Sequence, residues 1–393
     1  MTRRLPVTLV GGFLGAGKTS LLHNFISEHQ GGYLAILVEN PGTLNVDAKA
    51  MGGLCGVMGR SHDMVIEIPN GDEAVQVEWI AARLREFSEA GRFERVLIEL
   101  AGTSNAARLG DHFGLLPGQP ETFAPWAELH QIVCVVDALD FYWTMVAPLE
   151  KGPGSQGVLL DFQREQMAGA TLLILNKCDL IEDAERKACT RLLRSLNPHA
   201  NIIETAYAEV PPEMVSRLAS PQELGLAVER RGRPASISIG ANAEEPVLAC
   251  ALYRAYRPFH PGRFWDWFNA EHPGLLRVKG ITWLATRNLL VGGLSRTRWQ
   301  NGCGVAGLWW AALPREDWPD EPEELLRMQE TWREPYGDRR QELVLVGEAS
   351  LLSGLMPQLD ACLLTAEEYA RPVKDWAGFP DPFPVWDMEN DNE

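Results

Sequence analysis

Residues 12–19, which read Gly-Phe-Leu-Gly-Ala-Gly-Lys-Thr, constrain the fold of this chain more than any other segment. They match the pattern G-x-x-x-x-G-K-S/T and lie between an apolar run that ends at Val10 and an amphipathic stretch that begins at Thr19. Glycines in such a loop let successive backbone N–H groups face phosphate oxygens, and the helix N-terminus adds the positive end of its dipole. The pattern predicts a strand, a phosphate-binding loop and a helix. A glycine-rich turn without a ligand is the alternative.

The side chains of this loop have separate expected roles. We expect Lys18 to reach the β- and γ-phosphates and to act in catalysis, and Thr19 to ligate Mg²⁺ through its hydroxyl. The residues expected to line the phosphates are Gly12, Gly15, Ala16, Gly17, Lys18, Thr19 and Ser20.

A second motif indicates which base the nucleotide carries. Asn176, Lys177 and Asp179 form N-K-x-D directly after an apolar run, which places them at the carboxyl edge of a parallel sheet. The carboxylate of Asp179 can accept hydrogen bonds from N1–H and the 2-amino group of guanine, whereas adenine offers neither donor. We expect Asn176 to connect this loop to the phosphate loop and the Lys177 stem to lie over the base. The two motifs together predict GTP and GDP as ligands.

An acid for Mg²⁺ or for the attacking water is expected at the end of a neighbouring strand. Glu99 ends the apolar run at 95–100 and is the candidate catalytic and Mg²⁺-associated carboxylate, with a solvated strand-end acid as the alternative. Asp137, at the end of the next run, is the substitute, although it could instead cap the following turn.

Apolar runs alternate with helical stretches over the first half of the chain, which predicts an α/β domain with a mostly parallel sheet flanked by helices. We predict strands at 6–10, 33–38, 95–100, 131–136, 171–175 and 201–205, and helices at 19–28, 73–90 and 183–196. Prolines and small residues predict a linker at 210–246, before a smaller α+β domain at 247–370 and an acidic, aromatic tail at 371–393 that is loosely ordered or packed as an arm. The first domain then spans 1–209.

The second domain is expected to contain strands at 247–256, 280–286, 289–295, 307–312 and 342–347, with helices at 261–271 and 351–363. Its tryptophans Trp265, Trp267, Trp309 and Trp310 are expected to pack on the sheet, with a partner-binding patch as the alternative.

Charge and composition restrict the partners. The formal net charge of -17 disfavours binding to nucleic acid, because its phosphates would be repelled. The sequence begins without a long apolar stretch, so we expect no signal peptide, no membrane span and a cytoplasmic protein. Seven cysteines without a C-x-x-C pair predict reduced thiols.

These motifs resemble the CobW family of GTPases, which are regarded as metal chaperones or metalloenzyme activators. The resemblance covers most of the chain and rests on residues 11–19, 67–71, 176–179, 197–200, 253–264, 279–280, 283–287 and 337–343. It implies a P-loop GTPase domain followed by a CobW C-terminal domain, with slow, Mg²⁺-dependent hydrolysis and a client metalloprotein as partner. The segment 40–67 is the candidate switch.

The sequence departs from the family at the metal motif. Family members usually follow Asn-Gly with C-x-C-C, but here Asn70-Gly71 is followed by Asp72, Glu73 and Ala74. Carboxylates bind soft ions more weakly than thiolates do, so a Zn²⁺ or Co²⁺ site is doubtful. A replacement cluster of Glu39, His62, Asp72 and His112 is conceivable, although loop histidines are usually solvated, and Cys55 is expected to be passive. A metal-free regulatory or scaffold GTPase is therefore the alternative function, while Asp179 disfavours an ATP-dependent kinase.

Overall fold

A computed structural model describes residues 4–39, 63–69, 71–147, 158–229, 248–318 and 331–386, together with 325, 328 and 329. The chain divides into two compact units, Met1–Ile237 and Ser238–Glu393, and each is described by itself. No helix in these described segments is long and apolar enough to cross a membrane.

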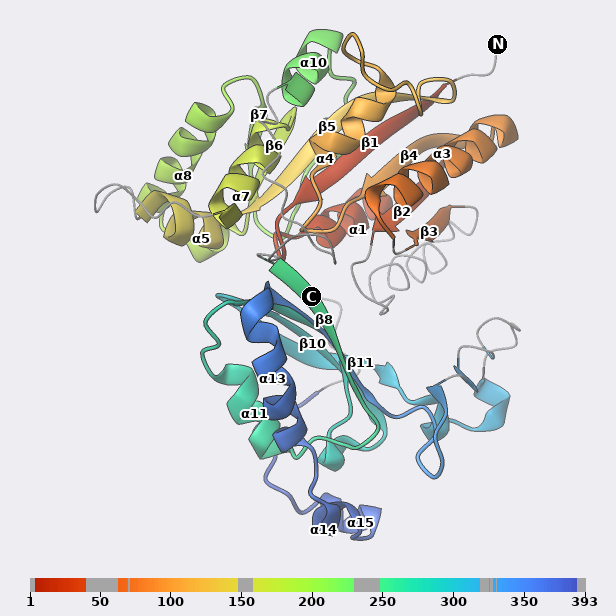
Figure 1. The fold of residues 1–393 in the computed structure, drawn as a ribbon, viewed down its shortest axis with the longest axis vertical. Coiled ribbons are helices and arrows are strands. Elements are labelled where there is room, and N and C mark those ends of the chain that lie inside the picture. The colour runs from red at the N-terminus through yellow and green to blue at the C-terminus, as the bar shows by residue number, and fades with distance from the viewer. Residues whose placement is uncertain are drawn as a thin grey trace. The chain divides into compact units, whose positions relative to one another are not determined.

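The first unit is built on a seven-stranded sheet in which every pair of neighbouring strands is parallel (Figure 1). Across the sheet lie β3 (Met64–Ile68), β2 (Tyr33–Glu39), β4 (Phe93–Glu99), β1 (Leu5–Gly12), β5 (Ala127–Asp137), β6 (Leu172–Asn176) and β7 (Asn201–Glu204). All eight residues of β1 are buried, as expected for a central strand covered on both faces.

Helices cover both faces of this sheet. They are α1 (Lys18–Glu28), α3 (Glu73–Ala90), α4 (Ala106–Gly110), α5 (Ala138–Phe141), α7 (Val158–Ala168), α8 (Asp183–Leu196), α9 (Pro212–Ser216) and α10 (Pro221–Glu229), with short turns η1 (Asp111–Phe113), η2 (Tyr142–Val146, π-helical) and η3 (Cys178–Leu180). α1 and α9 pack on the face that carries Val133 and Val135. Cys134 and Val136 point to the other face, because neighbouring side chains alternate along a strand, and there they pack with α5, α7 and α8.

The parallel arrangement brings five strand ends to one edge of the sheet. Gly12 of β1, Glu39 of β2, Glu99 of β4, Asp137 of β5 and Asn176 of β6 are the last residues of their strands. Ligands of open α/β sheets bind at such an edge.

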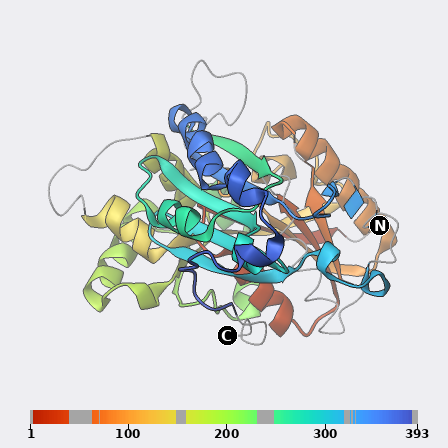
Figure 2. The same ribbon diagram turned by 90° about the horizontal axis from the view of Figure 1, so that it is seen from below.

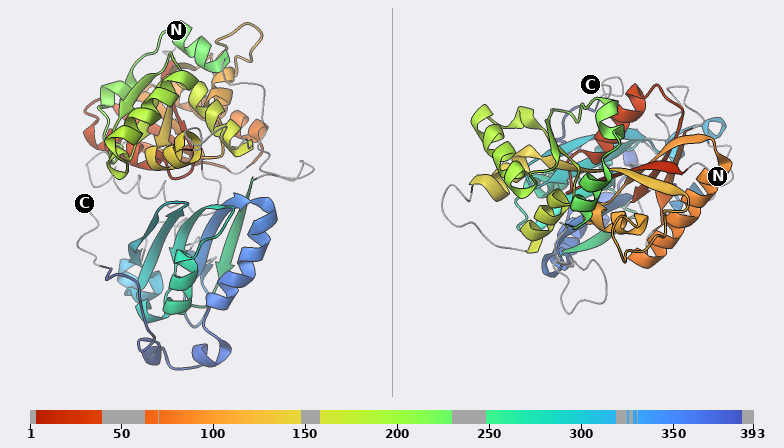
Figure 3. Two further views of the ribbon diagram at one scale, coloured as in Figure 1. Left: turned by 90° about the vertical axis from the view of Figure 1, so that its left-hand side faces the viewer. Right: turned by 90° about the horizontal axis from the view of Figure 1, so that it is seen from above.

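The second unit is a five-stranded antiparallel sheet with helices on one face. Its strands lie in the order β11 (Asn301–Leu308), β10 (Leu290–Thr297), β9 (Leu275–Thr282), β12 (Gln341–Glu348) and β8 (Leu248–Ala255). Helices α11 (Pro261–Asn269) and α13 (Ala349–Cys362) cover one face of it, and Figures 2 and 3 show their ribbons from other directions. They pack on the sheet through Phe264, Phe268 and Leu359. The two predicted fold classes, a parallel α/β sheet and a smaller α+β domain, are confirmed.

The end of the described chain packs onto the second unit. Short helices α14 (Ala366–Tyr369) and α15 (Val373–Trp376) follow α13, and Trp376 is fully buried. The guanidinium of Arg287 donates to both carboxylate oxygens of Asp381, at 2.8 and 3.0 Å. Residues 371–386 thus form a packed arm. Trp267 and Trp309 are buried, as expected of core tryptophans.

Two local predictions, the linker at 210–246 and the strand at 307–312, are wrong, while the candidate switch stays a prediction. The predicted linker at 210–246 contains α9 and α10, which belong to the first unit because Val215 and Leu224 are buried in its cores. The candidate switch at 40–67 lies outside the described residues up to 62, but its last part begins β3. The strand predicted at 307–312 ends at Leu308, and a 3-10 turn, η5 (Trp310–Ala312), follows it. Another such turn, η6 (Arg315–Asp317), follows further along.

Candidate functional site

The phosphate loop follows β1 and leads into α1, as its sequence pattern predicts. Gly12, Gly15 and Gly17 have φ values of 130°, 78° and 105°, a region that side chains with a β-carbon rarely adopt. A β-carbon at Gly17 would lie 2.4 Å from Nδ2 of Asn176, and one at Gly12 would lie 2.2 Å from the carbonyl oxygen of Val135. These glycines therefore let the loop approach both the sheet and the second motif.

Lys18 and Thr19 point to the strand ends. Lys18 is 6% exposed, and its ammonium donates to the carbonyl oxygens of Gly12 at 2.8 Å and Phe13 at 3.3 Å. The Thr19 hydroxyl donates to Oε1 of Glu99 at 2.9 Å, so the predicted Mg²⁺-associated pair lies together although 80 residues separate its members. A divalent cation between these two oxygens would take the place of that hydrogen bond.

Asn176 joins the phosphate loop to the base motif through a buried side chain. Its Nδ2 donates to the carbonyl oxygen of Ala16 at 2.9 Å, and its Oδ1 accepts from the backbone N–H of Ala208 at 2.8 Å. The expected connection between the two motifs is therefore present. The adjacent Lys177 has a φ of 62°, a left-handed conformation that turns the chain into η3.

The two acids of this region differ in exposure and in partners. Asp179 lies in η3 and is exposed, where an incoming base can reach it. Asp137 accepts hydrogen bonds from the backbone N–H groups of Leu139 and Asp140, at 3.0 and 3.1 Å, and pairs with the Lys177 ammonium at 2.6 Å. It caps α5, which was the alternative to its role as the substitute acid.

Residues 101–104, which we call the 101–104 loop, follow Glu99 and are held by two side chains that were not predicted to do so. Glu39 accepts from the backbone N–H of Ala101 at 2.9 Å and from the Ser104 hydroxyl at 2.8 Å. Gln166 of α7 donates to the carbonyl oxygens of Ser104 at 2.7 Å and Gly102 at 3.3 Å. These contacts join residues more than 60 positions apart, and neither Glu39 nor Gln166 belongs to a motif that indicates them.

The weak metal candidates have different surroundings. Asp72 caps α3 by accepting from the backbone N–H of Val75 at 2.9 Å, and Nδ1 of His112 lies 3.1 Å from the Thr122 hydroxyl. Burial lowers the pKa of His112, and Glu73 partly opposes that shift. Among the described residues, no three His, Cys, Asp or Glu side chains form a group that could hold a metal ion. His62 and Cys55 lie outside the described residues.

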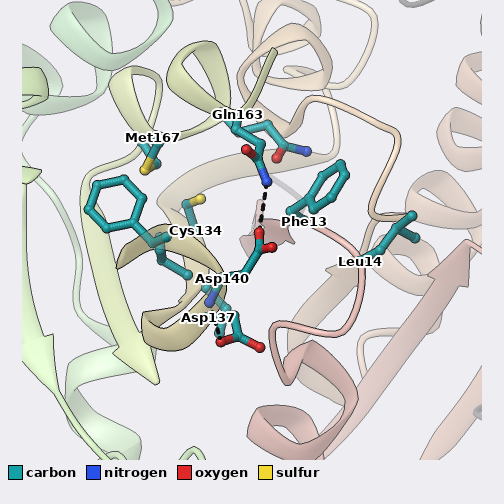
Figure 4. Close-up of a pocket in the computed structure, with 11 residues that line it drawn as sticks. Phe13, Leu14, Cys134, Asp137, Asp140, Gln163 and Met167 are labelled. Carbon is teal, nitrogen blue, oxygen red and sulfur yellow. Dashed lines mark hydrogen bonds between the residues drawn. The ribbon is translucent and has the colours of Figure 1, made fainter. Parts of the chain in front are cut away.

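A half-open pocket of about 330 Å³, counted with its open mouth, adjoins the phosphate loop at Phe13 and Leu14 (Figure 4). Nε2 of Gln163 donates to Asp140 across it at 3.3 Å. Burial raises the pKa of the Cys134 thiol, which lines the pocket, to about 12. This thiol is therefore mostly protonated at neutral pH, which makes it a poor nucleophile there.

Two family models match the chain. Residues 6–204 match the CobW/HypB/UreG nucleotide-binding domain, and residues 249–363 match the cobalamin synthesis protein cobW C-terminal domain. The first match covers the phosphate loop, Glu99 and the base motif.

Several relatives have curated names. The zinc-regulated GTPase metalloprotein activator 1 of Dictyostelium discoideum is 27% identical over 96% of this chain and 84% of that protein. The zinc chaperone CobW of Pseudomonas aeruginosa is 28% identical over 59% of this chain, which spans 63% of that protein's length. The crystal structure of Zn(II)-bound YjiA GTPase from E. coli is 16% identical over 92% of this chain and 100% of that one, with a TM-score of 0.36.

Proposed function

The chain belongs to the CobW/HypB/UreG family of nucleotide-binding proteins, and from this membership we propose that it is a cytoplasmic, Mg²⁺-dependent GTPase whose nucleotide state controls its contact with a client metalloprotein. The names of its relatives, a metalloprotein activator and a zinc chaperone, support the client part of the proposal. The nucleotide part rests on the site itself.

One buried side chain supports the choice of guanine most strongly. Asn176 is 2% exposed and holds the base motif against Ala16 of the phosphate loop. The motif that carries Asp179 is therefore bonded to the phosphate loop, which supports recognition of both ends of one nucleotide. The Asp179 carboxylate would pair with the two donors of guanine and would be left unpaired by adenine.

The proposed chemistry is phosphoryl transfer to water. Lys18 and the loop N–H groups stabilise the charge that develops on the transferring phosphate, and Thr19 with Glu99 positions Mg²⁺ or its water. Thr19 and Glu99 would hold Mg²⁺ directly or through water, and the ion would neutralise part of the charge on the phosphates. Hydrolysis is expected to be slow without the client.

A metal-free regulatory GTPase is the second candidate, favoured by one observation. Where the family places its C-x-C-C motif, this chain has Asp72 followed by Glu73 and Ala74, and Asp72 caps α3. A capping carboxylate contributes to helix stability without any metal.

Calorimetric titration with each nucleotide in the presence of Mg²⁺ tests the proposal. We expect GTP and GDP to bind and ATP not to compete. Asp179→Asn should weaken GTP binding and admit xanthine nucleotides, because an amide donates where the carboxylate accepts. Asp161→Asn, which removes an exposed carboxylate on α7, serves as the matched control. Comparable affinity of the wild-type protein for ATP would refute the guanine assignment.

A further inference from the structure

The carboxylate of Glu39 lies at the end of β2 and contacts a loop that the catalytic roles above leave unassigned. Its two oxygens accept from the Ala101 N–H at 2.9 Å and the Ser104 hydroxyl at 2.8 Å, and Oε1 also lies 3.5 Å from Nε2 of Gln76 on α3. Hydrogen bonds to an ionised carboxylate are stronger than neutral ones. Glu39 therefore holds the first and last residues of the 101–104 loop at once.

The 101–104 loop lies directly against the phosphate loop. A β-carbon at Gly102 would be 2.7 Å from the backbone nitrogen of Leu14 and 2.9 Å from its Cα, so the two backbones touch there. The Leu100 N–H also donates to the carbonyl oxygen of Val10 at 2.9 Å. Just before the loop, Glu99 is bonded to Thr19.

These contacts connect the 101–104 loop to the residues that would bind the third phosphate and its Mg²⁺. Mg²⁺ and a γ-phosphate act on Thr19 and on the N–H groups of the phosphate loop. Thr19 contacts Glu99, and Leu14 contacts Gly102. GDP lacks the third phosphate, which is the group that would reach this side of the phosphate loop. We therefore expect the affinity for GDP to depend less than the affinity for GTP on the position of the 101–104 loop.

We infer that Glu39 is a positioning residue for triphosphate recognition: it holds the 101–104 loop against the phosphate loop, so GTP binding depends on it and GDP binding does not. This inference rests on the proposed GTPase function and names a residue that sets its nucleotide-state specificity. Gln166 of α7 also donates to carbonyl oxygens of this loop.

The hydrogen bonds of Glu39 distinguish a positioning role from a role as a metal ligand. Each oxygen of Glu39 already accepts a hydrogen bond of ordinary length. A glutamine at this position could still accept from the Ala101 N–H through its oxygen and donate to the Ser104 oxygen through its amide, since a hydroxyl is both donor and acceptor. Binding of a metal ion by Glu39, in contrast, would be weakened by loss of the carboxylate charge.

The test measures GTPγS and GDP affinities, with Mg²⁺, for the full chain and its variants. For Glu39→Ala we expect about tenfold weaker GTPγS binding and a GDP affinity within about twofold of wild type. Glu39→Gln should recover GTPγS binding to within about threefold of wild type. Ser104→Ala should weaken GTPγS by a smaller factor, and the double variant with Glu39→Ala should add little, because both changes remove one interaction.

Glu78→Ala, which removes an exposed carboxylate on α3, controls for the change in net charge and should alter neither affinity. Equal loss of GTPγS and GDP binding in Glu39→Ala would mean a merely structural role and overturn the inference. So would a Glu39→Gln variant as impaired as Glu39→Ala, since that would show a need for the charge. A wild-type protein that binds neither nucleotide would instead remove the proposed function, and this inference with it.

Discussion

Replacing Asn176 by alanine removes the side chain that joins the two nucleotide motifs. The amide donates to the Ala16 carbonyl and accepts from the Ala208 N–H, and Ala208 is fully buried. In Asn176→Ala both backbone groups lose their partner in a place that water does not reach. The variant therefore affects both folding and binding.

The size of the effect follows from those two groups. A buried donor or acceptor left without a partner costs about 1–3 kcal/mol. Two of them give a loss of roughly 2–6 kcal/mol in the free energy of unfolding, which is a large part of the roughly 5–15 kcal/mol of a typical protein.

Urea unfolding followed by circular dichroism measures this loss. Because the chain has two compact units, the transition of the first unit is identified as the one that GDP shifts to higher urea, since a ligand stabilises the unit that binds it. Titration calorimetry in the absence of urea then gives the GDP affinity of the same variant. We expect both quantities to fall.

Asn197→Ala is the matched control. Asn197 is also 2% exposed, and its amide donates to the carbonyls of Met167 and Ala170, at 2.9 and 2.8 Å, and accepts from the Ala200 N–H at 3.1 Å. It should lose a similar free energy of unfolding but keep its GDP affinity. If Asn176→Ala unfolds at the wild-type urea concentration, or if both variants lose the same GDP affinity, the connection described here does not set the geometry of the nucleotide site.

Further expectations concern catalysis, metal and pH. Lys18→Ala should abolish tight triphosphate binding or turnover, while Glu99→Gln should keep binding and slow hydrolysis at least tenfold, about 1.4 kcal/mol in the barrier; turnover at the wild-type rate would place the acid elsewhere. Co²⁺ loading should give no intense thiolate charge-transfer band, and a moderate chelator should strip any bound ion; a chelator-resistant cobalt–thiolate band contradicts this. Any residual binding should depend on His62, His112 or Asp72 and weaken as histidine protonates, which for His112 takes place below the usual pKa of about 6.5 because burial lowers its pKa. The Arg263 guanidinium holds the pKa of Glu368 at about 2, below its ordinary 4.5, so the stability it contributes is present above pH 4.5 and lost as the pH falls through 2. Glu368→Gln should therefore lower the unfolding midpoint of the second unit at pH 7, and its difference from wild type should close by pH 2, whereas a constant difference would refute the pairing.

The nucleotide motifs are readable from sequence because their function requires particular residues at short spacings. Gly17 must lack a β-carbon beside Asn176, and Lys18 follows it directly. Both sites then come together because parallel strands end at the same edge. The fold class can be predicted from apolar runs such as β5 and β6, because these strands are buried on both faces.

What sequence patterns miss depends on contacts between distant residues. Helices α9 and α10 lie in a stretch whose prolines suggest a linker, and they become part of the first unit only because it supplies contacts such as the Arg95 guanidinium bonded to the Ser216 carbonyl at 2.9 Å. Strand β3 is short and only partly buried, so its apolar run is weak. The sequence suggests Glu39 only as a metal candidate, because no residue near it indicates that Ala101 and Ser104 are its hydrogen-bond partners.

Because Gly12 lies close to Val135, substitutions at Gly12 should be rejected for loss of folding, whereas substitutions elsewhere in the site should be rejected only for loss of nucleotide binding. A survey of all single substitutions that scores folded protein in cells should reject every change at Gly12, because a β-carbon would overlap the neighbouring strand whether or not nucleotide is recognised. The same survey should accept many changes at the exposed Asp179, which only a screen for nucleotide binding would reject. Related sequences that had lost nucleotide binding would therefore be expected to keep the first glycine of the loop long after the base-reading carboxylate had drifted.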